Sequence, residues 1–274
     1  MGIFDGILFC TDLDGTLFND QKRVSAENKA AIEYFQREGG IFTFVTGRMP
    51  YFAKQVAEVV APNAPFGCIN GGGLYDIEKG AYLWKTGLPD SVLELVRYVA
   101  REIPDMGIQI NGFDYILFCH ENQAMADFRR ATGVENRTCT LDEVDIPIGK
   151  IVFGHTDTKL IDRLSELLYA HPRANEFTFI RSELTLFEIL PPRMSKDVAM
   201  CKLAELLHID PKKIFAIGDY HNDIGMIRAA GVGVAVANAQ PEVIAVADYV
   251  TPVDNNHHAI AHVIDQIAKG HWIF

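Results

Sequence analysis

Short apolar runs alternate with amphipathic stretches over the first 70 residues of the chain. The apolar runs have the length of buried strands and occupy residues 7–11, 41–45 and 66–69. The stretches between them repeat apolar residues at helical spacing, over residues 25–38 and 50–60. Ser25 can cap the first helix and Pro50 can open the second. This strand–helix order predicts a parallel sheet with right-handed crossovers, to which all three runs contribute.

The pattern changes in the middle of the chain. Helical spacing at residues 91–103, 124–132 and 160–170 is mixed with strand-like runs. Four of these runs predict two hairpins, one turning near Asn111-Gly112 and the other around residues 181–183. Hairpins mixed with helices indicate an α+β unit with an antiparallel sheet. We therefore predict that residues 83–188 form a separate domain inserted into the first.

The strand–helix alternation returns after this insert. Helices are predicted at residues 195–207, 224–230, 241–247 and 259–268, and strands at 213–217 and 233–236. The predicted fold class is α/β, with a parallel-sheet core domain formed by residues 1–82 and 189–274. The inserted α+β domain interrupts this core.

Composition and charge exclude several classes of partner. The formal net charge of −11 argues against a general binder of nucleic acid or anionic membranes. No apolar run reaches membrane-spanning length, and no signal peptide is visible at the N-terminus. The five cysteines show no zinc or redox spacing, so we expect a reduced, cytoplasmic setting.

Polar residues follow the predicted parallel strands at the points where the strands end. They are Asp12 and Asp14, Thr46 and Gly47, Asn70, and Asp219 and Asp223. In open α/β sheets ligands bind beyond the carboxyl ends of the strands. We therefore expect these side chains to gather in one site.

The acids of this set suit a divalent cation. Asp12 and Asp14 alone are equally consistent with a turn or a helix cap. A calcium loop counted from Asp12 needs glycine at its sixth position and an acid at its twelfth, where Leu17 and Arg23 stand. Together with Asp219 the two acids form an oxygen-rich cluster of the kind that Mg²⁺ prefers.

The remaining polar residues suit a phosphate group. Thr46 and Gly47 offer a hydroxyl and an open backbone N–H, although Thr46 could also be a helix cap. Lys196 and Asn222 add a positive charge and an amide donor. The set predicts phosphoryl transfer, which depends mainly on positioning and charge stabilisation. Arg48 is interpreted as a surface or structural residue.

These residues also carry a resemblance. The runs Asp12-Leu13-Asp14-Gly15-Thr16, Thr46-Gly47-Arg48, Lys196 and Gly218-Asp219 with Asn222-Asp223 resemble the four motifs of the haloacid dehalogenase-like superfamily. The insert resembles the large type IIB cap of the Cof-type sugar-phosphatase subfamily. The resemblance implies a Rossmann-like core and an α+β cap that selects the substrate. The chain departs from the subfamily at Tyr220-His221 and His257-His258.

The resemblance also implies roles for individual residues. Asp12 resembles the nucleophile that forms an aspartyl-phosphate, and Asp14 resembles the general acid–base. Mg²⁺ would be bound by Asp12, by Asp14 through its backbone carbonyl and by Asp219, with Asp223 either a further ligand or a support for the others. The phosphoryl oxygens would be bound by Thr46, Gly47, Lys196 and Asn222. The histidines at 221, 257 and 258 are not expected to be metal ligands.

The resulting hypothesis is a Mg²⁺-dependent phosphatase that acts on a small phosphorylated metabolite such as a sugar phosphate. We expect a monomer or a weak homo-oligomer. Two alternatives remain open: a phosphosugar mutase with the same site, and a receiver module that accepts phosphate without turnover. The inserted domain and the second acid, Asp14, argue against the receiver.

Overall fold

The computed structural model describes residues 2–272, which form two compact units. The core unit comprises the residues up to Lys85 and those from Ser195 onward, and the inserted unit is Thr86–Met194. The predicted division at residues 83 and 188 differs from this one in two places. The last strand before the insert belongs to the core unit, and residues 189–194 belong to the inserted unit. None of the helices within residues 2–272 has the length and apolarity that crossing a bilayer requires.

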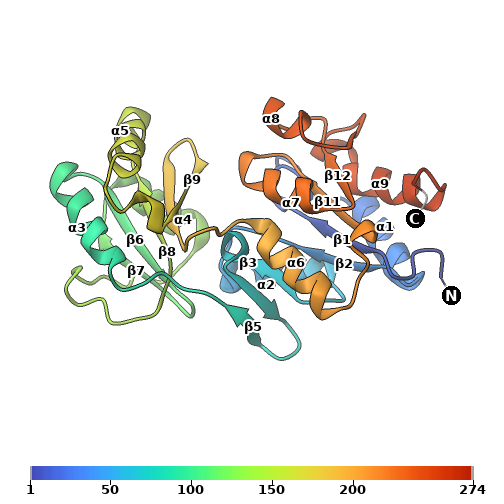
Figure 1. Cartoon of the computed structure of the whole chain (residues 1–274), viewed down its shortest axis with the longest axis horizontal. Coiled ribbons are helices and arrows are strands. Elements are labelled where there is room, and N and C mark those ends of the chain that lie inside the picture. Colours follow the sequence, from blue (N-terminus) through green and yellow to red (C-terminus); the bar gives the residue numbers. More distant parts are fainter. Residues whose placement is uncertain (1, 273–274) are drawn as a thin grey trace. The chain divides into compact units, whose positions relative to one another are not determined.

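The core unit is built on a five-stranded parallel sheet of order β13-β12-β11-β1-β2 (Figure 1). Its strands are β1 (Leu8–Thr11), β2 (Ile41–Phe44), β11 (Ile214–Gly218), β12 (Val232–Ala235) and β13 (Tyr249–Val250). β1 lies between β2 and β11, so the chain moves to opposite sides of β1 in its two halves. In such sheets this reversal of strand order creates the crevice that binds ligands.

Helices connect these strands. They are α1 (Ala26–Arg37), α2 (Pro50–Val60), α6 (Lys196–Leu206), α7 (Ile224–Ala229), α8 (Pro241–Ile244) and α9 (Ala259–Ala268). Short 3₁₀ turns lie at Ile69–Gly71, Pro211–Lys213, His221–Asp223 and Asn255–His257. The predicted helix starts are confirmed: Ser25 accepts a hydrogen bond from the backbone of Asn28, and Pro50 opens α2.

The two faces of the parallel sheet are both apolar because successive side chains of a strand point to opposite faces. Leu8 and Cys10 of β1 pack in one cluster with residues of α6 and α7. Phe9 points the other way and stacks between Phe42 and Phe215, with Phe35 of α1 at its edge. The same alternation places residue 12, which follows β1, on the α6 side.

The third predicted strand meets the parallel sheet at a parallel bridge between Val45, which follows β2, and Gly67, but it is not a ladder strand of that sheet, so the prediction holds only in part. β3 (Phe66–Cys68) pairs antiparallel with β4 (Gly73–Asp76), which pairs with β5 (Ala81–Lys85). The chain reverses directly after β3, where Asn70 and Gly71 adopt φ values of +51° and +95°. This left-handed turn starts a hairpin, which the apolar run alone does not reveal.

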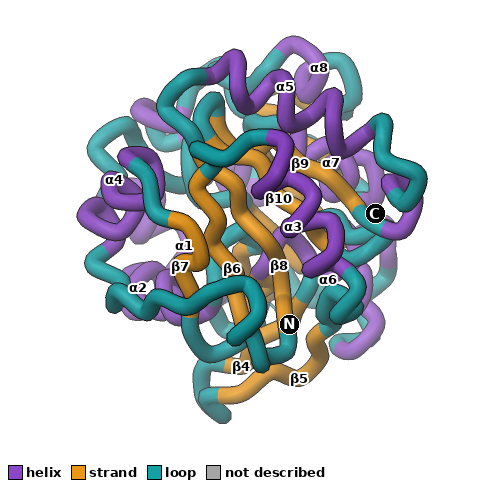
Figure 2. The backbone as a smooth tube through the Cα atoms, turned by 90° about the vertical axis from the view of Figure 1, so that its left-hand side faces the viewer, coloured by secondary structure: helices purple, strands orange, loops and turns teal. Residues whose placement is uncertain are grey.

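The inserted unit contains an antiparallel sheet of order β7-β6-β8-β10-β9 (Figure 2). Its strands are β6 (Gly107–Gly112), β7 (Ile116–His120), β8 (Ile148–Gly154), β9 (Thr178–Glu183) and β10 (Leu186–Leu190). Its helices are α3 (Val92–Glu102), α4 (Gln123–Thr132) and α5 (Thr158–Tyr169), with a 3₁₀ turn at Ala174–Glu176. Apolar residues of α3 and α5 cover one face of the sheet, and this apolar layer is the core of the unit.

The hairpins predicted for the insert are present, but the second turn was placed wrongly. Residues 181–183 belong to β9, and the turn lies at residues 184–185. β9 is the edge strand of its sheet, and edge strands accept polar side chains. The polar character of residues 181–183 therefore marks an edge and not a turn.

Candidate active site

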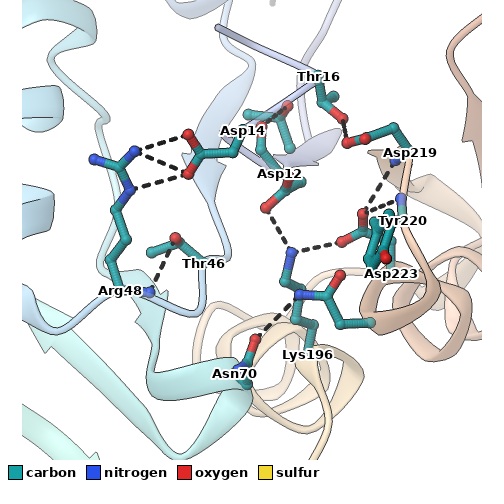
Figure 3. Close-up of polar contacts among 12 residues, drawn as sticks. Asp12, Asp14, Thr16, Thr46, Arg48, Asn70, Lys196, Asp219, Tyr220 and Asp223 are labelled. Carbon is teal, nitrogen blue, oxygen red and sulfur yellow. Dashed lines mark hydrogen bonds and ion pairs between the residues drawn. The ribbon is translucent and has the colours of Figure 1, made fainter. Parts of the chain in front are cut away.

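The parallel pairing of β1 and β11 brings the acids of two distant segments together. Thr11 is paired with Ile217, and the backbone N–H of Asp12 donates to the carbonyl of Ile217 at 2.9 Å. Asp12 and Asp219 each follow their strand closely. One carboxylate oxygen from each of Asp12, Asp219 and Asp223 lies within 4.8 Å of the others (Figure 3). We call these three residues the acid cluster.

Lys196, the first residue of α6, contacts the acid cluster. Its Nζ lies 2.5 Å from Asp12 Oδ1 and 2.6 Å from Asp223 Oδ1, and its side chain is 1% exposed. Burial by itself would lower the pKa of Lys196, but the two carboxylates outweigh it and raise the pKa above its usual value. Lys196 is therefore a buried, permanently charged ammonium group.

Asp223 has both of its carboxylate oxygens engaged. Oδ1 accepts from Lys196, and Oδ2 accepts the backbone N–H groups of Asp219 and Tyr220, each at 3.0 Å. These bonds fix the loop after β11. Asp223 therefore positions Lys196 and Asp219 directly.

Asp12 and Asp219 each keep one oxygen available. Within residues 2–272, the hydrogen bonds to these two carboxylates come from Lys196, which donates to Asp12 Oδ1, and from Thr16, which donates to Asp219 Oδ1 at 2.7 Å. Burial and the neighbouring carboxylates raise the pKa of Asp12 to about 8, even though Lys196 opposes them. Burial and Asp223 likewise raise the pKa of Asp219 to about 6.

This donor set fits a magnesium ion. Magnesium binds carboxylate oxygens and retains water molecules that a phosphate can replace. The crowding that raises the two pKa values is relieved by a divalent cation near the free oxygens. Asp12 and Asp219 could ligate such a cation directly, with Asp223 behind them.

Gly15 permits the close approach of the two motif loops. It has φ of +87°, and a Cβ atom at this position would lie 2.4 Å from Asp219 Oδ2. Any other residue would push against the oxygen that is free to bind a cation. Here the glycine is required both by the backbone conformation and by the space.

Asp14 lies in a different environment from Asp12. Its carboxylate is held by the guanidinium of Arg48 through contacts of 2.8, 2.8 and 3.1 Å (Figure 3). Lys22 Nζ also donates to it at 2.9 Å. Arg48 also lies over the ring of Phe18. Burial would raise the pKa of Asp14, but Arg48 and Lys22 outweigh it and lower the pKa. The carboxylate of Asp14 is therefore not part of the acid cluster, and the metal contact predicted through its backbone carbonyl stays a prediction.

The residues predicted to bind phosphate lie on neighbouring loops. Thr46 is 2% exposed, and its hydroxyl accepts the backbone N–H of Arg48 at 3.2 Å. Asn222 donates through Nδ2 to Asn70 Oδ1 at 3.2 Å. A Cβ at Gly47 would lie 2.8 Å from the same oxygen of Asn70, so a larger residue there would displace the Asn70 side chain. Asn70 thus connects the loops that carry Gly47 and Asn222.

The sequence interpretation missed two residues of this site. Arg48, read as a surface or structural residue, clamps Asp14, and Thr16 orients Asp219. Both residues belong to the segments that resemble family motifs, and both come soon after a strand, so their positions could have indicated a role in the site. His221 and His257 pair instead with Glu242 and Asp254.

The comparisons with known proteins agree with this geometry. A family model described as haloacid dehalogenase-like hydrolase matches residues 9–264. YxeH of Bacillus subtilis (strain 168) is 31% identical over 274 residues, which cover 95% of this chain and 97% of YxeH. The 5-amino-6-(5-phospho-D-ribitylamino)uracil phosphatase YwtE of the same organism is 28% identical, covering 95% of this chain and 98% of YwtE.

Solved structures share the fold over nearly the whole chain. A haloacid dehalogenase-like hydrolase from Bacteroides thetaiotaomicron superposes with a TM-score of 0.84 at 25% identity, covering 95% of this chain and 99% of that one. The HAD subclass IIB sugar phosphatase BT4131 gives a TM-score of 0.84 at 19% identity, covering 96% and 99%. The predicted fold class, a parallel-sheet α/β core interrupted by an α+β unit, is confirmed.

Proposed function

The chain belongs to the haloacid dehalogenase-like hydrolase family and is a phosphatase, and from this premise we propose its reaction in detail. It hydrolyses phosphomonoesters of small metabolites, such as sugar phosphates, with Mg²⁺ as cofactor and through an aspartyl-phosphate intermediate. The observation that carries the proposal is the convergence of three carboxylates within 4.8 Å, with the ammonium of Lys196 against two of them.

Asp12 is the proposed nucleophile. Its Oδ1 is fixed by Lys196, so its other oxygen is held in one orientation and can attack the phosphorus atom. The bond between phosphorus and the ester oxygen breaks as the Asp12–phosphorus bond forms. Lys196, with Thr46, Gly47 and Asn222 on neighbouring loops, would hold the phosphoryl oxygens.

Asp12, Asp219 and the backbone carbonyl of Asp14 would hold Mg²⁺, with Asp223 supporting them. When bound, the ion supplies positive charge that offsets the charge of the phosphoryl oxygens.

Asp14 is the proposed general acid–base. It would give a proton to the departing ester oxygen and later accept one from the water that hydrolyses the aspartyl-phosphate. Its ion pair with Arg48 keeps it ionised, which suits the second step. Donation in the first step requires Asp14 to take up a proton and to loosen its contacts with Arg48.

The setting of the enzyme is also part of the proposal. The inserted unit selects the substrate, as the cap type suggests, and the protein acts in the cytoplasm as a monomer or weak homo-oligomer. The free cysteines support a reducing compartment, and the net charge of −11 argues against a nucleic-acid partner.

Substitution of the nucleophile tests the reaction. Asp12→Asn should lower phosphate release from a panel of metabolite phosphates with Mg²⁺ by about 10³-fold or more. Asp90→Asn, an exposed acid of the inserted unit, is the matched control and should retain full activity. More than trace turnover by the Asp12 variant would reject Asp12 as nucleophile. Net release of inorganic phosphate separates hydrolysis from a mutase, which returns the phosphoryl group to a sugar.

A further inference from the structure

A short segment of the chain lies against the outer edge of the sheet in the inserted unit. β7 is an edge strand of that sheet, and Phe118 of β7 forms a parallel bridge with Thr138. The backbone N–H of Phe118 donates to the carbonyl of Arg137 at 2.8 Å, and that of Cys139 donates to the carbonyl of Phe118 at 3.4 Å. These two bonds fix the register of the two segments, so Cys119 and Cys139 stand opposite each other.

The thiols of Cys119 and Cys139 lie in contact. Their sulfur atoms are 3.5 Å apart, and both cysteines are free. Neighbouring strands lie about 4.8 Å apart, which is inside the range of about 4.4–6.8 Å that the Cα atoms of a disulfide span. Formation of a disulfide at this place therefore requires a small movement of two side chains and no rearrangement of the backbone.

The five cysteines differ in how well a reagent in solution can reach them. Cys10 and Cys68 are each 0% exposed, and burial raises the pKa of both thiols, which keeps them protonated and unreactive. Cys119 and Cys139 are half-buried, and Cys201 is exposed. A small disulfide can therefore reach the contacting pair, which supplies both of the thiols that a protein disulfide needs.

We propose that Cys119 and Cys139 are a site of reversible disulfide formation, oxidised by small disulfides such as oxidised glutathione and reduced again by glutathione. The disulfide joins β7 to the segment that follows α4 and closes a ring that contains this helix. The site lies within the inserted unit and does not involve the acid cluster. The twenty positions between the two cysteines concealed it, because no redox motif has that spacing.

Cys139 reacts first. It belongs to an exposed segment, whereas burial and the neighbouring Cys139 thiol raise the pKa of Cys119 and keep that thiol protonated. The Cys139 thiolate attacks one sulfur of oxidised glutathione, forms a mixed disulfide and releases one glutathione, which takes up the thiol proton.

Cys119 completes the exchange. The part of its pKa rise that comes from the Cys139 thiol is lost once the Cys139 sulfur is bonded to glutathione. The Cys119 sulfur then attacks the Cys139 sulfur, the mixed disulfide breaks, and a second glutathione leaves with the Cys119 proton. In total the protein gives up two hydrogen atoms, and one oxidised glutathione becomes two reduced ones.

Mass spectrometry of the full-length protein tests the proposal. The reduced protein is incubated with oxidised glutathione, its remaining thiols are blocked with N-ethylmaleimide, and it is digested with trypsin. In wild type Cys119 and Cys139 should be neither blocked nor glutathionylated. Trypsin should instead release residues 102–129 joined to residues 138–150, and a reductant should separate the two peptides.

Serine variants test the order of the two steps. Cys119→Ser removes the second thiol, so the mixed disulfide of Cys139 with glutathione should accumulate. Cys139→Ser removes the first thiol, and the remaining Cys119 should react with oxidised glutathione about tenfold more slowly than Cys139 does in the Cys119 variant. Cys201→Ser removes an exposed thiol outside the pair and is the matched control, which should form the disulfide at the rate of wild type.

Several results would overturn the proposal. One is a wild type in which the pair stays free while Cys201 takes up glutathione. Another is a mixed disulfide at Cys139 that persists in wild type, since Cys119 would then not reach it. A disulfide that forms only between two chains, seen as a dimer on a non-reducing gel, or only after urea has unfolded the protein, would overturn it too. Faster reaction of Cys119 than of Cys139 would overturn the order of the steps.

Discussion

Lys196→Met is the substitution that probes the site most directly. It removes the ammonium that lies within 2.6 Å of both Asp12 and Asp223 but keeps a long aliphatic side chain in the same buried space. Two buried carboxylates then lose the charge that compensates them. Removing one partner of a buried ion pair typically costs about 3–5 kcal/mol of folding free energy, because an uncompensated charge remains in the interior.

The cost should depend on pH. The pKa of Asp12 is already raised to about 8 with Lys196 present, and without the ammonium it will rise further. An acid whose folded-state pKa exceeds its unfolded value binds protons more tightly in the folded state. Stability therefore decreases as the pH rises from the unfolded pKa, near 3.8, toward the folded one. Lys196 does not titrate in this range, and wild type shares the decrease up to its own Asp12 pKa of about 8, so the loss caused by the substitution should grow from about pH 8 upward.

Tryptophan fluorescence during urea unfolding measures this loss in the right part of the molecule. Trp84 and Trp272 both belong to the core unit, so the signal reports that unit. Lys29→Met, an exposed lysine of α1, is the control and should change stability by less than about 0.5 kcal/mol. The loss for the Lys196 variant should reach about 3–5 kcal/mol at pH 8 and diminish when Mg²⁺ is added. A loss under about 1 kcal/mol at pH 8, or an equal loss at pH 5.5 and pH 9, would refute the reasoning.

Three further predictions follow from the same geometry. Burial and neighbouring carboxylates raise the pKa of Asp12 to about 8 and that of Asp219 to about 6, so Mg²⁺ binding should release protons near neutral pH. The affinity for Mg²⁺ should therefore fall from pH 8 to pH 6. Calorimetry that detected no proton release on Mg²⁺ binding at pH 7 would contradict this. Arg48→Gln removes a guanidinium that lowers the pKa of Asp14, so the part of the pH–rate profile that reports Asp14 should move to higher pH. An unchanged pH–rate profile would mean that Arg48 does not set the pKa of Asp14. Gly15→Ala places a Cβ 2.4 Å from Asp219 Oδ2 and should weaken Mg²⁺ binding about tenfold or more. Gly80→Ala, also at positive φ but with open space around it, should leave the affinity unchanged.

The parallel core could be predicted from the sequence because its strands are buried on both faces. Such strands are continuous apolar runs, and the residue after each run falls at the same edge of the sheet. This was sufficient to bring Asp12 and Asp219 together, although 207 positions separate them in the numbering. The chain reversal after β3 could not be predicted, because it depends on the left-handed backbone conformation of Asn70, which the sequence alone does not specify.

The pairing of charges could not be predicted in the same way. Asp12 and Asp14 are two residues apart, and strand alternation suggested that their side chains would share one space. The chain turns at Gly15, however, and Asp14 meets Arg48 from the loop after β2. Which lysine or arginine side chain contacts which acid depends on how the loops that carry them are placed and on the length of each side chain.

The pKa values of the two motif acids give a physical reason why the proposed reaction would require a bound cation. In the protein alone the pKa of Asp12 is raised and that of Asp14 is lowered, so the proposed nucleophile is harder to ionise than a free aspartate and the proposed acid is harder to protonate. This is the reverse of what the first step requires. Positive charge beside Asp12 would ionise it, and an incoming phosphate dianion would compete with Asp14 for Arg48 and Lys22 and raise the pKa of Asp14. Cation and substrate together would therefore shift both protonation equilibria in the direction that the first step requires, and the metal-free protein should be inactive even where it still binds phosphate esters.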